Sequence, residues 1–136
     1  MIPAVDSSGW SPFRAAVEAK DFVQVEATLA AGVHFRSPVV FKPYEGRPAV
    51  AALLRAVGEV LAPAFSYQWQ VSQDDREVLF FTTTVDGRDV EGVDLLRYDQ
   101  DGLVCELVVM MRPASGLLAV RDAVGRRLAA SGPASS

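Results

Sequence analysis

The spacing of the apolar residues changes after Pro63, and this change constrains the fold more than any other feature. Before Pro63, apolar residues recur at the spacing of an amphipathic helix: Val50, Leu53, Leu54, Val57 and Leu61. After Pro63, they alternate with polar residues, as in a strand with one buried face: Phe65, Tyr67, Trp69 and Val71. Helices followed by a run of strands predict an α+β domain whose helices cover one face of a curved sheet.

Capping residues predict where the first helices begin. Ser11 precedes a proline, which is favoured at the first helical position because its missing N–H is not needed there. Asp21 and Gln24 have the spacing of a capping box and predict that a second helix begins there. Gly32 is expected to end this second helix.

Turn residues divide the rest of the chain. The predicted elements are a strand over 33–37, a loop over 38–46, a helix over 48–62, and strands over 65–72, 77–85, 88–98 and 103–112. Asp86-Gly87 and Asp101-Gly102 are pairs that tight turns prefer, so the last strands form an antiparallel meander. Ser115 is expected to cap a final helix with an apolar stripe formed by Leu117, Val120, Val124 and Leu128.

Length and composition exclude several classes of protein. A chain of 136 residues is one ordinary domain, which we place at 10–128, with a flexible tail over 129–136. The net charge of −4 argues against nucleic acid as a partner, because phosphate binding needs a basic surface. One cysteine, Cys105, and one histidine, His34, exclude an internal disulfide and disfavour a metal centre. There is no glycine-rich nucleotide motif, so we expect neither a cofactor nor a metal.

We expect the protein to be cytoplasmic. The N-terminal residues lack the basic region and continuous apolar run of a signal peptide. The longest apolar zone, 48–65, is interrupted by Arg55, Glu59 and Pro63, so no contact with a membrane is expected.

Asp94 is the main candidate for chemistry. A curved sheet closed by helices leaves a cone-shaped interior, which is a natural site for an apolar ligand. Asp94 lies in a strand between Val93 and Leu95, and burial there would raise its pKa and let it donate a hydrogen bond to a ligand oxygen. The alternatives are a structural Asp bonded to a neighbouring Tyr, Trp or backbone group, and an acid exposed at the cavity mouth.

Alternation assigns further side chains to the same inner face. The predicted ligand-binding residues on strands are Phe35, Tyr67, Trp69, Leu79, Phe81, Thr83, Leu107, Val109 and Met111. Thr83 is the expected second polar contact in an otherwise apolar cavity. Val17 joins this set from the first helix. His34 and Arg112 are expected to point away from the cavity, and Cys105 to be a small buried hydrophobe.

The opposite face of the last strands is also apolar. Its predicted residues are Val93, Leu95, Val104, Val108 and Met110. The helices cover one face of the sheet, so the second face needs another cover, and we expect a homodimer through it. The charged residues expected to pair across the two-fold axis are Glu91, Arg97, Glu106 and Arg112.

Three segments, 13–22 (FRAAVEAKDF), 33–57 (VHFRSPVVFKPYEGRPAVAALLRAV) and 90–113 (VEGVDLLRYDQDGLVCELVVMMRP), resemble the nuclear transport factor 2-like superfamily. Within it, they are similar to the SnoaL-like polyketide cyclase and ketosteroid isomerase-like branch. The resemblance implies a cystatin-like α+β barrel, in which a cone-shaped curved antiparallel sheet wraps around the N-terminal helices and a C-terminal helix follows. It also implies pocket positions for Phe13 and Ser37.

The catalytic residues of the isomerase branch are only partly matched. The resemblance places its general base, a carboxylate before a proline, at Ser37, and its helix tyrosine at Phe13. Its second oxyanion donor, an aspartic acid, matches Asp94. Without the base, proton abstraction beside a carbonyl lacks its agent. The Asp-Arg-Asp arrangement of the epoxide hydrolase branch would need Arg112 and a second carboxylate to face inward, and neither is expected.

The sequence therefore predicts a protein that binds a small, hydrophobic, oxygenated molecule. The first hypothesis is cofactor-free acid–base chemistry of an isomerase, cyclase or hydrolase type, with Asp94 as the acid. The second is a non-catalytic protein that binds an apolar metabolite in the same cavity, and the third is a dimerisation module with a vestigial pocket. The missing base at Ser37 favours the second over the first.

Overall fold

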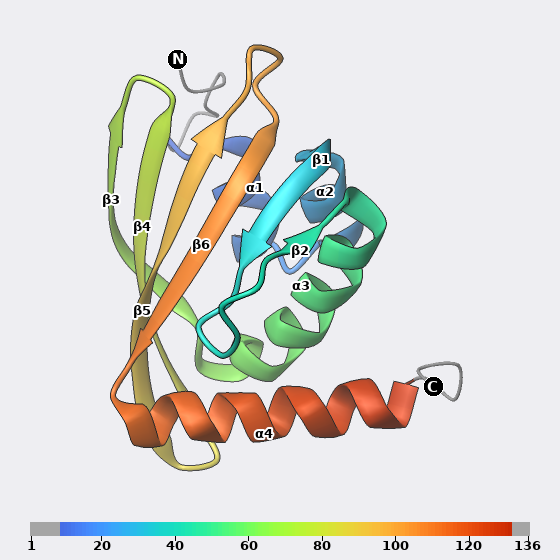
Figure 1. Ribbon diagram of the computed structural model, residues 1–136. Coiled ribbons are helices and arrows are strands. Elements are labelled where there is room, and N and C mark those ends of the chain that lie inside the picture. The colour runs from blue at the N-terminus through green and yellow to red at the C-terminus, as the bar shows by residue number, and fades with distance from the viewer. Residues whose placement is uncertain (1–8, 132–136) are drawn as a thin grey trace.

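The helices begin where the sequence supplies caps. The computed structural model describes residues 9–131 (Figure 1). The Ser11 hydroxyl caps α1 (Pro12–Glu18) by accepting a hydrogen bond from the Arg14 N–H at 3.3 Å. The Asp21 carboxylate caps α2 (Phe22–Ala27) through the Gln24 N–H at 3.1 Å. Both predicted caps are confirmed.

The two longer helices begin close to prolines. In α3 (Arg47–Leu61), Pro48 lies in the first turn, and a short 3-10 turn, η1 (Ala62–Ala64), follows the helix. The last helix, α4 (Ala114–Ser131), follows Pro113, so Ser115 is its second residue and not its cap. It also continues three residues beyond the predicted limit at 128, and the rest of the predicted tail lies outside the described residues.

Within residues 9–131, six strands form one sheet. They are β1 (Leu29–Arg36), β2 (Tyr44–Glu45), β3 (Ser66–Gln73), β4 (Arg76–Val85), β5 (Arg88–Tyr98) and β6 (Val104–Arg112). Their order is β2-β1-β6-β5-β4-β3. The pairs of the meander β3–β6 are antiparallel, as predicted, whereas β1 runs parallel to β6.

The first strand is longer than the sequence predicts. The second helix ends at Ala27, and the chain enters β1 at Leu29, whose register partner is Val104 of β6. The Val104 N–H also donates to the Thr28 carbonyl at 2.8 Å. Long-range pairing with β6 therefore overrides the local helical pattern that extends towards Gly32.

Two β-bulges reverse predicted side-chain directions. Tyr67 pairs with Phe81, but Trp69 pairs with Phe80, so Gln68 is an extra residue in β3. Trp69 therefore lies on the outer face, where it is 47% exposed and stacks on the Phe80 ring. An extra residue moves every later side chain of the strand to the other face until the register is restored.

The second bulge lies at Cys105. Arg97 pairs with Glu106, whereas Tyr98 pairs with Val104, which leaves Cys105 without a partner residue. Val104 is therefore fully buried in the core, so its predicted place on the outer face is wrong. The other predicted outer residues, Val93, Leu95, Val108 and Met110, do lie on that face, and Met110 is exposed.

The helices and the sheet enclose the core between them. Figure 1 shows α1, α2 and α3 grouped on one side of the curved sheet and α4 running across its end. Helix α4 contacts α3, β4, β5 and β6, and so closes this end of the cone. The predicted α+β fold, a curved sheet wrapped around N-terminal helices with a C-terminal helix, is confirmed. Within residues 9–131, none of the helices has both the length and the apolar character needed to span a lipid bilayer.

Candidate functional site

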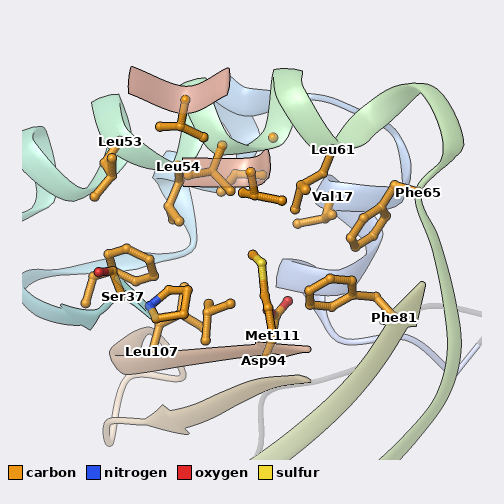
Figure 2. A pocket seen from close by; sticks show the side chains of 18 of the residues that line it. Val17, Ser37, Leu53, Leu54, Leu61, Phe65, Phe81, Asp94, Leu107 and Met111 are labelled. Atoms are coloured by element: carbon orange, nitrogen blue, oxygen red, sulfur yellow. The ribbon is translucent and has the colours of Figure 1, made fainter. Parts of the chain in front are cut away.

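A cavity of about 250 Å³ lies between the helices and the inner face of the sheet. Figure 2 shows Leu54 and Leu61 of α3 on its helical side and Leu107 and Met111 of β6 on its sheet side. Most of its wall is apolar, and a few polar side chains interrupt it. This is the usual composition of a site for small organic molecules.

Most of the predicted site residues line this cavity. They are Asp94, Phe13, Val17, Phe35, Ser37, Tyr67, Phe81, Leu107, Val109 and Met111. Helix α1 supplies two of them from one face, and the antiparallel strands supply most of the others through alternation. Their placement brings them together, while their role in binding stays a prediction.

Three predicted residues do not line the cavity. Trp69 lies on the outer face because of the bulge at Gln68. Leu79 faces inward, but it is fully buried in the core beyond the cavity wall. The Thr83 hydroxyl donates to the Leu61 carbonyl at 2.8 Å, so it satisfies the end of α3 and does not offer a polar contact to a ligand.

Apart from Phe13 and Val17 of α1, the helical side of the cavity was missed by the sequence-based assignment. Side chains of α2, α3 and α4 complete the wall, among them Phe22, Val25, Leu53, Leu54, Val57, Leu61, Val120 and Val124. The apolar stripes of α3 and α4 were visible in the sequence, and a stripe that covers a hollow sheet lines the hollow. Applying that argument to α3 and α4 would have found them.

Asp94 lies at the floor of the cavity and pairs with Tyr67. The Tyr67 hydroxyl donates to Asp94 Oδ2 at 2.6 Å, and both side chains are buried. Among the described residues no donor reaches the other oxygen, Oδ1, and this oxygen is not sealed from the cavity. Figure 2 shows the Asp94 side chain beside Met111 and Phe81.

Burial sets the protonation of this pair. Burial raises the pKa of Asp94 to about 7, the hydrogen bond from Tyr67 lowers it, and the charge of Glu77 raises it. Burial also raises the pKa of Tyr67, and the neighbouring Asp94 carboxylate raises it further. Below about pH 7, Asp94 is therefore neutral and can donate a hydrogen bond from Oδ1 into the cavity.

A second buried carboxylate, Glu77, was missed by the sequence-based assignment. Glu77 is 2% exposed, and its Oε1 accepts hydrogen bonds from the Ser11 hydroxyl at 2.8 Å and the Tyr98 hydroxyl at 2.5 Å. Burial raises the pKa of Tyr98 well above its ordinary value, and the Glu77 charge adds to this. The sequence signal for the burial of Glu77 was its spacing of two residues from Leu79, because alternation places both side chains on the inner face.

Arg14 is a buried cation of α1 that the sequence-based assignment also missed. Its guanidinium lies 5.3 Å from the centre of the Tyr67 ring and donates to Gln70 Oε1 at 2.8 Å. It also approaches Glu18 at 3.7 Å. The positive charge therefore packs over the Tyr67 ring, and within residues 9–131 no ion pair joins it to Asp94 or Glu77.

Ser37 and Glu18 bear on the question of a general base. The Ser37 hydroxyl accepts hydrogen bonds from the N–H groups of Val39 and Val40, at 3.2 and 3.1 Å, and so orders the loop that follows β1. Glu18 lines the cavity, so the expectation of no second inward carboxylate is wrong. Its ion pair with Arg14 holds it at the α1 side of the wall.

Arg112 takes no part in the cavity. It donates to Glu91 at 2.6 Å on the outer face, as alternation predicts for Arg112. The Asp-Arg-Asp arrangement therefore does not form around Asp94. Across residues 9–131, no three or more His, Cys, Asp or Glu side chains are grouped as a metal site.

Comparison with known proteins shows the family to which the chain belongs. Residues 12–107 match the SnoaL-like domain. The chain is 35% identical to a steroid delta-isomerase from Pseudomonas aeruginosa, with 88% of each chain covered and a TM-score of 0.83. It is 33% identical to an uncharacterized cystatin-like protein from Silicibacter pomeroyi DSS-3, covering 87% of this chain and 83% of that one, with a TM-score of 0.81. No curated protein matches it. The chain belongs to the SnoaL-like domain family of the nuclear transport factor 2-like superfamily.

Proposed function

We propose that the protein binds a small, neutral, largely apolar molecule through one acceptor oxygen, to which Asp94 donates a hydrogen bond. The observation that carries this proposal is the Asp94 carboxyl group at the floor of an apolar cavity. Its pKa is about 7, and no hydrogen-bond donor among residues 9–131 reaches its Oδ1. An acceptor such as a carbonyl oxygen satisfies that donor, whereas a hydrocarbon leaves it without a partner.

The cavity volume limits the ligand. About 250 Å³ is slightly below the range of about 300–1,000 Å³ for sites of drug-sized molecules. We therefore expect a compact ligand with one or two rings. The apolar walls contributed by α3, α4 and β6 favour a hydrocarbon skeleton around the single polar group.

Acid–base catalysis is the activity that we propose for this site. A hydrogen bond from Asp94 to a carbonyl oxygen stabilises the enolate that forms when a neighbouring carbon loses a proton. Similarity to a steroid delta-isomerase supports this class of reaction. The proton must be taken up by a base, and Glu18 is the other carboxylate in the cavity wall.

Non-catalytic binding is the second candidate, and two observations favour it. Ser37, at the position where the resemblance places a base, has no carboxylate and caps its own loop. Glu18 is held in an ion pair with Arg14. Under this candidate the cavity holds an oxygenated molecule without changing it.

A matched pair of compounds tests the binding proposal. The cyclic ketone 1-tetralone and its hydrocarbon tetralin have the same ring skeleton and differ in the carbonyl group. We expect 1-tetralone to shift the NMR signals of cavity residues at pH 6 and to bind at least about fivefold more tightly, the worth of a modest buried hydrogen bond. Equal affinities, or no binding of either compound, would contradict the proposal.

Hydrogen–deuterium exchange separates the two candidates. In deuterated buffer, a catalytic site would replace the hydrogens next to the 1-tetralone carbonyl with deuterium faster than buffer alone. Asp94→Leu, which cannot donate to the carbonyl, should abolish the acceleration. Binding without any acceleration would select the non-catalytic candidate.

We also propose a homodimer through the outer face of the sheet. The exposed apolar residues on this face include Trp69, Val71 and Met110. The face also carries charges of both signs, in the ion pairs that Glu106 forms with Arg36 and Arg97.

We expect a dimer at micromolar concentration in sedimentation experiments and a monomer for Trp69→Glu. The control is Val23→Glu on α2, an exposed apolar residue away from this face, which should stay dimeric. A monomeric unmodified protein would contradict the proposal.

A further inference from the structure

Glu77 and Asp94 are diagonal neighbours on the inner face of the sheet. Glu77 pairs with Leu96, and Leu79 pairs with Asp94, so the two carboxylates are offset by two positions along the paired strands. Diagonal side chains of this kind are about 7–8 Å apart. Both groups are buried, so water screens the interaction between them only weakly.

Glu77 has hydrogen-bond donors but no cation. Its Oε1 accepts from Ser11 and Tyr98, and within residues 9–131 no lysine or arginine forms an ion pair with it. The Ser11 hydroxyl accepts from the Arg14 N–H at the same time, so one hydroxyl joins the beginning of α1 to the sheet. Glu77 is thus both a buried charge and an anchor for α1.

We infer that Glu77 is a positioning residue for the cavity: its negative charge adds to the effect of burial in keeping Asp94 neutral and able to donate, and its bond to Ser11 fixes α1 beside the cavity. This inference rests on the proposed role of Asp94. Helix α1 supplies Phe13 and Val17 to the cavity wall, so the anchor bears directly on the shape of the site. The raised pKa of Asp94, to which the Glu77 charge contributes after burial, supports the electrostatic part.

The other groups near Asp94 do not substitute for Glu77. Tyr67 donates to Asp94 and lowers its pKa. On α1, Arg14 and Glu18 pair with each other. The cations in the cavity wall are Lys20, between α1 and α2, and Arg121 on α4. The facing side chains of β6 are apolar: Leu107, Val109 and Met111.

The test is Glu77→Gln, which removes the charge and keeps an acceptor oxygen for Ser11 and Tyr98. The Asp94 carboxyl carbon is followed by NMR during a pH titration of the ligand-free protein. We expect the titration midpoint to fall by about 1.5 pH units, as for two charges about 8 Å apart at an effective dielectric constant of about 20. The pH above which 1-tetralone binding is lost should fall with it.

The matched control is Glu106→Gln on the outer face. Glu106 is also largely buried and pairs with Arg36 and Arg97, so the substitution removes an equal charge outside the cavity and should leave the midpoint in place. A midpoint that Glu77→Gln leaves unchanged overturns the inference. If Glu77→Gln does not fold, the NMR signal of the Glu77 carboxyl carbon is followed in the unmodified protein. An ionised Glu77 between pH 5 and pH 7 supports the inference, and a protonated Glu77 overturns it.

Failure of the inference can be told apart from failure of the proposed function. The titration of Asp94 is measured without ligand, so a shifted midpoint supports the role of Glu77 even where 1-tetralone does not bind. The converse result is 1-tetralone binding that depends on Asp94 together with an Asp94 titration midpoint that is unchanged in Glu77→Gln. That result retains the proposed function and overturns the inference.

Discussion

Asp94 and Glu77 are buried carboxylates that each accept a hydrogen bond from a tyrosine, but they lie in different surroundings. Asp94 has Tyr67 at 2.6 Å as its donor and borders the cavity. Glu77 has both Tyr98 at 2.5 Å and Ser11 at 2.8 Å, and it lies outside the cavity wall. The two carboxylates are diagonal neighbours on one face of the β4–β5 hairpin, and Tyr67 reaches Asp94 from β3.

The difference lies in the free hydrogen-bonding capacity that each carboxylate keeps, and under the proposed function it distinguishes a structural carboxylate from one that meets a ligand. Glu77 uses its hydrogen bonds to attach α1, so its role is complete inside the protein. By contrast, no hydrogen-bond donor among residues 9–131 reaches Asp94 Oδ1, and this oxygen is open to a ligand in the cavity. A buried polar group without its full set of partners costs stability, and such groups are concentrated at binding sites.

The largest expected effect concerns the pH dependence of stability at Asp94. Its pKa is raised from 3.8 unfolded to about 7 folded, so between these values the folded state binds more protons. The unfolding free energy therefore falls as pH rises from 4 to 8, by about 4 kcal/mol from this group at 1.4 kcal/mol per pH unit. Urea denaturation at several pH values measures the unfolding free energy, and in Asp94→Asn this pH-dependent contribution should be absent. Identical pH profiles for the two proteins would show that Asp94 titrates normally.

The next effect concerns the anchor of α1. Ser11→Ala removes both a helix cap and a hydrogen bond to a buried carboxylate, so we expect a loss of about 3 kcal/mol in the unfolding free energy. Asp21→Ala removes the exposed cap of α2 alone and should cost about 1 kcal/mol. Urea denaturation of both variants makes the comparison. Equal losses would mean that the bond from Ser11 to Glu77 contributes no stability.

The smallest effect separates the two tyrosines. Tyr98→Phe should cost about 2 kcal/mol of stability, because it removes a donor from a buried carboxylate, and it should leave the cavity unchanged. Tyr67→Phe removes the hydrogen bond that lowers the pKa of Asp94, so that pKa should rise further above 7. An NMR titration of Asp94 in both variants measures this. A lower pKa of Asp94 in Tyr67→Phe would contradict the assigned sign.

The sequence predicted the order of helices and strands because caps, prolines and tight-turn glycines act locally. Asp86 and Gly87 both have positive φ, 50° and 76°, as the predicted hairpin turn requires. It also placed Asp94 in the cavity, because β5 alternates without interruption through that residue. Local rules suffice wherever the register is regular.

The errors come from features that depend on distant contacts. The bulges at Gln68 and Cys105 reversed the side-chain directions of Trp69 and Val104, and no local sequence pattern identified either bulge. Alternation from Leu79 assigns Glu77 to the inner face, but the Ser11 hydroxyl that bonds its buried carboxylate is 66 residues away in the chain, so the sequence did not show its partner. The early start of β1 at Leu29 likewise depends on pairing with β6.

The most direct test of the central claim is the affinity for 1-tetralone as a function of pH. Only neutral Asp94 donates to the ketone, so the affinity should be highest below pH 7 and about 30-fold weaker at pH 8.5, following the neutral fraction. Asp94→Asn, whose amide donates at every pH, should bind without this pH dependence. An affinity that is the same at pH 6 and pH 8.5 in the unmodified protein would contradict the account.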